Sequence, residues 1–469
     1  MRASSARAQA ITGESSSRTN VAATNGPLRV SSANGRYFVD ASGKPVYLTG
    51  MHNWDVLQDS GESDPPPAMP YESYLNQMAA QGQNLLRLWS STSTRWAAWN
   101  SNWYTDPLPF ARTGPGNAGD GKPKFDLTKL NQAYFDRLRA RVILARSKGI
   151  YIDVMLFNGW DLGPRPNTNV DNPWRGNPFN ADNNINGIDG DADNDGFGYE
   201  LHSLNNAAIL ELQKAYARKV IDTVNDLDNV IYEISNESLA VSVQWQYEMV
   251  RFVKSTVASK PMPHPVGMTA PDWDVDNAAV FNSPADWVSP SKLNGYEDNP
   301  PSATGNKVVL ADTDHIFGVG GDAAWVWKSF TRGLNPIWMD DLGSDDWKQG
   351  ARMAMGKTRA YALRMNLLAA VPRNDLASSG YALVVPKTEY LVFKPNGGSF
   401  TVNLSDAAGS FAVEWHNVNT GQTVIGNTVT GGKTLTFNPP FGGHAVLYLR
   451  LSGAPANFIR KAFLPMIRG

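Results

Sequence analysis

Apolar and polar residues follow two different periods along this chain. Between residues 47 and 369, short apolar runs alternate with longer segments in which apolar residues recur every three or four positions. The short runs predict buried parallel strands, and the longer segments predict helices that cover them. We expect strands near residues 47–50, 84–89, 150–157, 229–238, 266–269, 286–289, 307–311 and 336–339. We expect helices at residues 71–82, 130–148, 205–225, 243–257, 323–331 and 346–369.

The pattern changes to period two after residue 382, where short segments are separated by glycine-rich turns. Such spacing predicts a small β-sandwich. Ahead of the barrel, Asn34-Gly35 and Ser42-Gly43 indicate hairpin turns. We therefore predict an α/β chain: a (β/α)8 TIM barrel followed by a small all-β sandwich domain. The expected divisions are a disordered tail at 1–25, the barrel at 26–378, the sandwich at 379–452 and a second tail at 453–469.

Two long segments, 90–124 and 161–201, are expected to be irregular loops of the kind that carry function. The second contains DGDADNDG at residues 189–196, which resembles the first half of an EF-hand calcium loop. His202 stands where such a loop has its bidentate Glu, and Glu200 lies two residues earlier. A structural calcium ion and a solvated acidic turn are both open. The calcium-ligand candidates are Asp189, Asp191, Asp193 and Asp195.

Composition narrows the function classes. The 469 residues carry a net charge of −2, which gives no support for a nucleic-acid partner. The absence of Cys excludes disulfides and thiolate metal sites. The 15 Trp residues suit a sugar-binding cleft, although Trp also fills large cores. No apolar run is long enough to predict a transmembrane helix, and residues 1–25 lack the apolar centre of a secretory leader.

Polar residues stand at the ends of two predicted strands. The fourth ends in Asn236 and Glu237, and the seventh runs into Asp312 and Asp314. The carboxyl ends of barrel strands meet at one face, so these groups are expected at the barrel mouth. Arg87 lies inside the apolar second strand, where a charge is costly unless paired. A structural ion pair and a contact with a catalytic carboxylate are both open for Arg87.

Three stretches resemble clan A glycoside hydrolases with a C-terminal β-sandwich. They are NLLRLW around Arg87, YEISNES around Asn236-Glu237, and YLVFKPNGGSFTVNL in the predicted sandwich. The resemblance spans about residues 27–451 and looks closest to cellulase-like and apiosidase-like (DUF4038-type) bacterial enzymes. It implies that Glu237 is the general acid/base and that Asn236 holds a sugar hydroxyl. The family ends its seventh strand in Glu, whereas this chain offers Asp312 and Asp314.

We therefore expect a retaining, rather than inverting, glycoside hydrolase that cleaves a plant or microbial polysaccharide or oligosaccharide. Its catalytic candidates are Glu237, Asp312 and Asp314, with Asp312 the first choice for the second carboxylate. The alternative is an inactive carbohydrate-binding or surface-attachment protein. The expected partner is carbohydrate, catalysis needs no cofactor, and the location is secreted or cell-surface. Substrate-binding candidates are His52, Trp54, Arg87, Trp89, Asn158, Trp160, Asn236, Tyr296, His315, Trp338 and Asp340.

Overall fold

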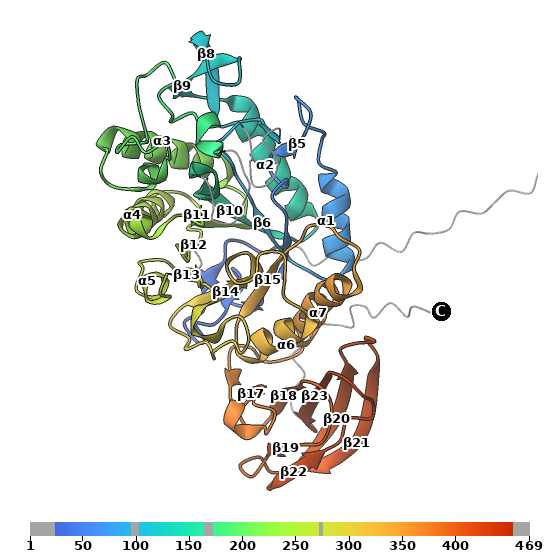
Figure 1. The fold of residues 1–469 in the computed structure, drawn as a ribbon. Helices are drawn as coiled ribbons and strands as arrows, with labels where there is room; N and C mark the ends of the chain where they lie inside the picture. The colour runs from blue at the N-terminus through green and yellow to red at the C-terminus, as the bar shows by residue number, and fades with distance from the viewer. Residues whose placement is uncertain (1–23, 95–102, 164–171, 272–274, 454–469) are drawn as a thin grey trace, which may run out of the picture.

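The computed structural model of the protein describes residues 24–94, 103–163, 172–271 and 275–453. Nearly all of the two predicted tails, 1–25 and 453–469, lies outside these residues. Figure 1 shows a strand barrel surrounded by helices, with an all-β part beside helices α6 and α7. None of the helices in the described ranges has the length and apolar character needed to cross a membrane.

The centre of the larger part is an eight-stranded sheet of parallel strands. Its strands in chain order are β4 (Gly50–His52), β6 (Leu85–Leu88), β10 (Tyr151–Asn158), β11 (Val230–Asn236), β12 (Val266–Thr269), β13 (Trp287–Ser289), β14 (Val308–Asp312) and β15 (Asn335–Met339). The backbone N–H of Asn84 donates to Thr49 O at 2.9 Å, which joins the first strand to the second. Gly50 permits this approach, because a Cβ there would collide with the carbonyl oxygen of Leu85. The predicted (β/α)8 barrel is confirmed.

Helices cover the barrel in the order that the apolar period predicts. They are α1 (Tyr71–Ala80), α2 (Gln132–Ser147), α3 (Ala207–Val224), α4 (Val243–Ala258), α5 (Ala278–Phe281), α6 (Ala323–Thr331) and α7 (Asp346–Ala362). Asn206 begins α3 by accepting the backbone N–H groups of Ala208 and Ile209. The buried face of α3 repeats at Ile209, Tyr216, Val220 and Val224. The short α5 was not expected, and α7 ends before the predicted residue 369.

An N-terminal hairpin closes the bottom of the barrel. Strands β1 (Arg29–Val30), β2 (Phe38–Val39) and β3 (Pro45–Val46) form an antiparallel sheet, as the turn signals predict. Leu28 and Phe38 pack with Leu85 and Trp287 near the amino ends of the barrel strands. Because this end is filled by apolar side chains, polar chemistry is left to the carboxyl ends of the strands.

The segment 90–124 is more regular than expected, so the prediction of an irregular loop is wrong there. Strand β7 (Tyr104–Asp106) pairs with β5 (Asp59–Gly61), and β8 (Phe110–Asn117) pairs with β9 (Pro123–Leu130). Phe110 and Phe125 anchor this second hairpin by packing with Trp174 and Leu201 from the following loop. The hairpin therefore packs in a second apolar cluster, which meets the barrel core where the ring of Phe110 lies 6.3 Å from that of Tyr216.

The C-terminal part is all antiparallel, as its period-two pattern predicts. Its larger sheet has the order β16-β17-β18-β23-β20-β21, and β19 pairs with β22 in a second sheet. The bounds are β16 (Val371–Pro372), β17 (Ala382–Val385), β18 (Glu389–Lys394), β19 (Phe400–Asn403), β20 (Ser410–Asn417), β21 (Thr423–Thr430), β22 (Thr434–Phe437) and β23 (Ala445–Leu451). Phe400, Trp415 and Phe437 pack together between the sheets. Strand β16 belongs to this part although it precedes residue 378, the predicted boundary.

Candidate active site

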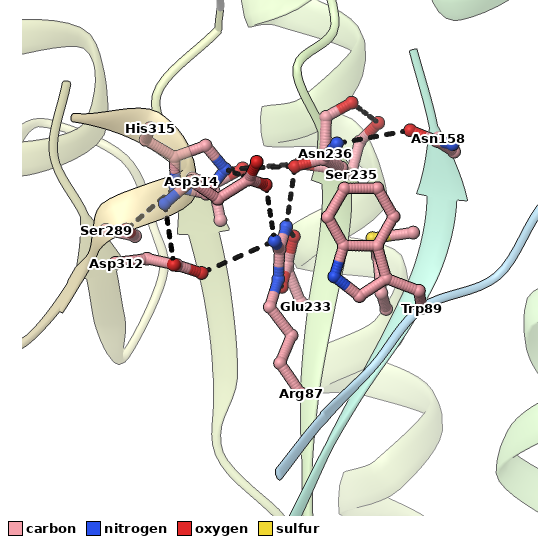
Figure 2. A network of polar contacts seen from close by, with 12 residues as sticks. Arg87, Trp89, Asn158, Glu233, Ser235, Asn236, Ser289, Asp312, Asp314 and His315 are labelled. Atoms are coloured by element: carbon pink, nitrogen blue, oxygen red, sulfur yellow. Dashed lines mark hydrogen bonds and ion pairs between the residues drawn. The ribbon is translucent and has the colours of Figure 1, made fainter. Parts of the chain in front are cut away.

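Arg87 is the centre of a buried polar network at the upper end of the barrel (Figure 2). Its Nε and Nη2 groups each donate to one oxygen of Glu233 at 2.6 Å. Nη2 also donates to Asn236 Oδ1 at 2.7 Å, and Nη1 donates to Asp314 Oδ2 at 2.8 Å. The remaining contact is between Nη1 and Asp312 Oδ2 at 3.3 Å. A guanidinium has five N–H groups, so every donor of Arg87 faces an acceptor and its plane is fixed.

Asp312 is the last residue of β14, and its two carboxylate oxygens have different surroundings. Oδ1 accepts the backbone N–H of Asp314 at 3.0 Å and contacts His52 Nε2 at 2.8 Å. The indole N–H of Trp89 can only donate, so His52 Nδ1 accepts it at 2.8 Å and Nε2 carries the hydrogen donated to Asp312. Oδ2 has no hydrogen-bond partner among the described residues. Burial opposes ionisation, but His52 and Arg87 outweigh it and hold the pKa of Asp312 well below its usual range.

Asp314 does not continue the strand. It lies in a 3-10 turn, Thr313–His315, that begins as β14 ends, yet its carboxylate still reaches Arg87. Burial raises the pKa of Asp314 to about 6, and the charge on Asp312 adds to this, while Arg87 opposes it. Two carboxylates that share one guanidinium thus titrate at different pH: Asp314 becomes protonated as pH falls through about 6, while Asp312 stays ionised. Such divergence is common where two acids have separate roles.

Asn236 has a fixed amide orientation. Its Oδ1 accepts from Arg87 and from His315 Nε2, at 2.7 and 3.0 Å, and its Nδ2 donates to Asn158 Oδ1 at 3.2 Å. His315 Nδ1 lies 3.0 Å from the hydroxyl of Ser289. Burial, together with Arg87, lowers the pKa of His315 to about 3, so this ring is neutral at neutral pH. The predicted residues Arg87, Asn158, Asn236 and His315 therefore belong to one connected network.

Glu237 follows β11 in an unusual backbone conformation. Its φ of 41° lies in the left-handed region, which costs a non-glycine residue about 1–3 kcal/mol and is frequent at functional sites. Ser235 and Ser238 hydroxyls meet at 2.5 Å on either side of it, and Ser238 also contacts His202 Nδ1 at 2.8 Å. Gly159 lies against this turn, because a Cβ there would be 2.5 Å from Ser238 Cα. These contacts fix the direction of the Glu237 backbone.

The other predicted binding residues are placed differently. Trp338 is fully buried and donates its indole N–H to Gly320 O. Asp340 is fully buried in a two-bond pair with Arg352, at 2.8 and 2.6 Å. Tyr296 is also buried, on the loop after β13. Trp54 and Trp160 are partly exposed. Substrate contact by Trp338 and Asp340 stays a prediction.

Sequence reasoning missed three participants. Glu233 and Asp153 are fully buried carboxyl groups in the middle of β11 and β10, and Ser289 ends β13. The signal for the two acids was present, because an acidic residue inside an otherwise apolar strand is costly and demands a partner. Trp347, 43% exposed and edge-on to Trp338, was also missed.

The acidic loop brings together a different set of carboxylates from the one predicted. Oxygens of Asp191, Asp193 and Glu200 lie within 4.8 Å of one another. Asp191 additionally accepts the backbone N–H groups of Asp195 and Gly196, at 3.1 and 2.9 Å. Asp189 caps the start of the turn by accepting the N–H of Asp191 at 3.1 Å. Glu200 lies two residues before the expected twelfth position of the loop. It belongs to the cluster, whereas the predicted ligands Asp189 and Asp195 do not.

Comparison with known proteins agrees with this fold. Residues 94–259 match a model described as a domain of unknown function, DUF6298. No curated protein matches the chain. A solved structure described as a glycoside hydrolase is 14% identical, with a TM-score of 0.61 over 92% of this chain and 98% of that one. A glycoside hydrolase family 5 protein from Bacteroides vulgatus ATCC 8482 is 15% identical, with a TM-score of 0.59 over 94% and 96% of the two chains. At such identity the likeness concerns the fold, and the DUF4038-type resemblance stays a prediction.

Proposed function

We propose that this protein is a glycoside hydrolase that cleaves glycosidic bonds in a polysaccharide or oligosaccharide. The observation that carries the proposal is the state of Asp312. Its Oδ1 is fixed by His52 and by a backbone N–H, while its Oδ2 lies beside Arg87 without a hydrogen bond from any described residue. An ionised carboxylate oxygen that keeps its lone pairs available suits attack on an anomeric carbon or activation of water.

The second carboxyl group in the proposed mechanism is Glu237. Glycoside hydrolysis needs an acid that gives its proton to the leaving oxygen, on the opposite side of the bond from the ionised group. Glu237 follows β11 and Asp312 ends β14, so the two residues approach the barrel mouth from strands that are not neighbours. Asn236, with its amide oriented by Arg87 and His315, supports the assignment by lying next to Glu237. Asp314 is proposed to bind a sugar hydroxyl beside the reacting bond.

A retaining course is proposed, with Asp312 as the nucleophile. Attack by Asp312 forms a bond to the anomeric carbon while Glu237 protonates the departing oxygen; water, deprotonated by Glu237, then displaces Asp312. Azide added to Asp312→Ala should yield a glycosyl azide of inverted configuration, which identifies Asp312 as the missing nucleophile. Failure of azide to restore turnover, in a variant that still binds the sugar, would point to an inverting course.

The activity itself is tested by measuring reducing-sugar release on a panel of plant and microbial polysaccharides. Wild-type protein should release sugars from at least one of them, and Glu237→Gln and Asp312→Asn should not. Binding of a polysaccharide with no release by wild type would instead identify a carbohydrate-binding protein on a barrel scaffold.

A further inference from the structure

A second pair of acidic side chains lies inside the barrel, away from the mouth carboxylates. Asp153 on β10 is in register with Arg87 on β6, and Glu233 is on the next strand, β11. Both acids are fully buried. The proposed hydrolytic steps use neither of them, so their retention inside an otherwise apolar barrel needs a physical reason.

The hydrogen bonds of this pair identify where a proton must be. Both oxygens of Glu233 accept N–H groups of Arg87, and neither oxygen of Asp153 receives a donor from the described residues. Asp153 and Glu233 act on each other electrostatically inside the barrel. Two carboxyl oxygens can share a hydrogen bond only when one of them carries a hydrogen, and Glu233 is already engaged as a carboxylate. Burial, and then the nearby charge of Glu233, raise the pKa of Asp153 well above its usual range, in agreement with this placement.

We propose that Asp153 and Glu233 form a buried acid–carboxylate pair that holds one proton and fixes Arg87 beneath the mouth carboxylates. Asp153 donates its hydroxyl to Glu233, and Glu233 grips Nε and Nη2 of Arg87, leaving Nη1 for Asp312 and Asp314. Both acids are positioning residues, because they act on the reaction only through Arg87. A charged Asp153 would instead add an unpaired anion to an interior where such a charge costs several kcal/mol.

The pair also determines how strongly the positive charge of Arg87 acts on the carboxyl groups at the barrel mouth. The charged groups that act on Asp153 are Glu233, Arg87 and Asp312. Those facing Asp314 are Arg87, Asp312, His52 and, at 3.7 Å, His315. Since Glu233 neutralises part of Arg87, removing its charge should strengthen the pull of Arg87 on Asp314 and lower the pKa of that acid.

The proton on Asp153 can be observed without any substrate. Infrared difference spectra in H2O and D2O, recorded at mildly alkaline pH where Asp314 is ionised, should contain a protonated-carboxyl band that Asp153→Asn removes. Asp340→Asn is the matched control, because Asp340 is equally buried but both of its oxygens accept from Arg352; this substitution should leave the band unchanged. A spectrum of Asp153→Asn identical to wild type would overturn the proposal.

The kinetic test rests on the proposed function. It separates the proposed pair from a purely structural role of Glu233, because the two predict opposite shifts in the pH dependence of kcat/KM. The acid side of the pH profile of kcat/KM is expected to follow the protonation of Asp314. Glu233→Gln should move this acid limb toward lower pH by about one pH unit, because the loss of the negative charge on Glu233 strengthens the effect of Arg87 on Asp314. If Glu233 only maintained local packing, a loosened Arg87 would move this limb toward higher pH, which would contradict the proposal. Asp153→Asn should leave the limb where it is, since Asn is neutral like the protonated acid and still donates to Glu233. An ionised Asp153 would give a downward shift in that variant. Lack of hydrolysis in wild type removes the proposed function but leaves the infrared result as the test of the pair.

Discussion

Asp312 and Asp314 show how two neighbouring carboxyl groups acquire separate properties. Both contact Nη1 of Arg87, but only Asp312 also accepts from His52 and from a backbone N–H. Those two extra donors favour the charged form of Asp312, whereas burial dominates for Asp314 and raises its pKa to about 6. The different titration of the two carboxyl groups, on which their proposed roles rest, therefore follows from one additional turn of backbone after β14.

This difference predicts separate kinetic effects. Asp312→Asn should reduce kcat severely, and Asp314→Asn should mainly raise KM. In wild type, Asp314 becomes protonated as pH falls through about 6, so its ability to accept a sugar hydroxyl is lost and KM should rise on the acid side. Asp312 stays ionised through this pH range, so its titration does not contribute to the pH dependence there. The pH profile of Asp314→Asn should be flat where that of wild type bends. A dead Asp314→Asn beside an active Asp312→Asn would reverse the two assignments.

Glu237→Gln should keep the fold and lose about 10²–10⁴-fold in turnover, because general acid–base catalysis contributes about that much. The loss should be largest on substrates with poor leaving groups, which depend most on protonation. Steady-state kinetics on natural and activated glycosides measures it. Glu297→Gln, an exposed site on the loop after β13, is the control and should behave as wild type. Near wild-type turnover by Glu237→Gln on the natural substrate would remove Glu237 from the mechanism.

At the scale of elements, the sequence predicts the barrel well because each strand is a compact apolar run bounded by polar residues. β11 illustrates both the strength and the limit of this signal. The run from Val230 to Ile234 predicts the strand, and the polar ending at Asn236 predicts the mouth. Glu233 falls within the same run, and its partner Arg87 is 146 residues away, so period alone cannot pair them. The interior network is a product of strand register, which the sequence leaves open.

The β8–β9 hairpin was missed for a different reason. Its apolar residues, among them Phe110 and Phe125, are few and are spread between glycine and proline residues that normally indicate loops. Their burial depends on contacts with Trp174 and Leu201, which belong to a loop some fifty or more residues later in the chain. Local pattern cannot show a cluster that long-range contacts create.

The acidic loop offers a prediction about metal binding. If Asp191, Asp193 and Glu200 bind calcium, the ion should stabilise the fold by about 2.7 kcal/mol when present at a hundredfold excess over Kd. Melting curves with calcium and with a chelator, together with elemental analysis, measure this. Asp193→Asn should abolish the calcium-dependent shift, whereas Asp182→Asn, on the same loop but outside the cluster, should retain it. Equal melting temperatures with calcium and chelator would leave a solvated acidic turn.

At the scale of the whole molecule, the barrel and the C-terminal sheet share apolar packing. Trp327 of α6 is fully buried, and its ring lies 6.5 Å from Phe393 of β18 and 5.8 Å from His416 of β20. Arg364, just after α7, pairs with both oxygens of Glu414 at 2.7 and 2.8 Å, and Tyr361 donates to the same carboxylate. One apolar cluster continues from the barrel helices into the face of the larger C-terminal sheet that is turned away from the β19–β22 sheet. The C-terminal part is thus a structural support for the helices that follow β14 and β15.

This shared packing predicts that the two parts unfold together. Trp327→Ala should leave a cavity between them and cost about 3–5 kcal/mol, the usual range for a buried Trp. Differential scanning calorimetry should therefore show a single transition in wild type, displaced as a whole to lower temperature in the variant. Trp347→Ala is the matched control, because Trp347 is 43% exposed and its loss should move the transition little. Two resolved transitions, with only one of them displaced by Trp327→Ala, would mean that the barrel and the C-terminal sheets are energetically independent and that the contact at Trp327 merely joins them. A single displaced transition instead makes the C-terminal sheets part of the scaffold that supports β14, the strand that ends in Asp312.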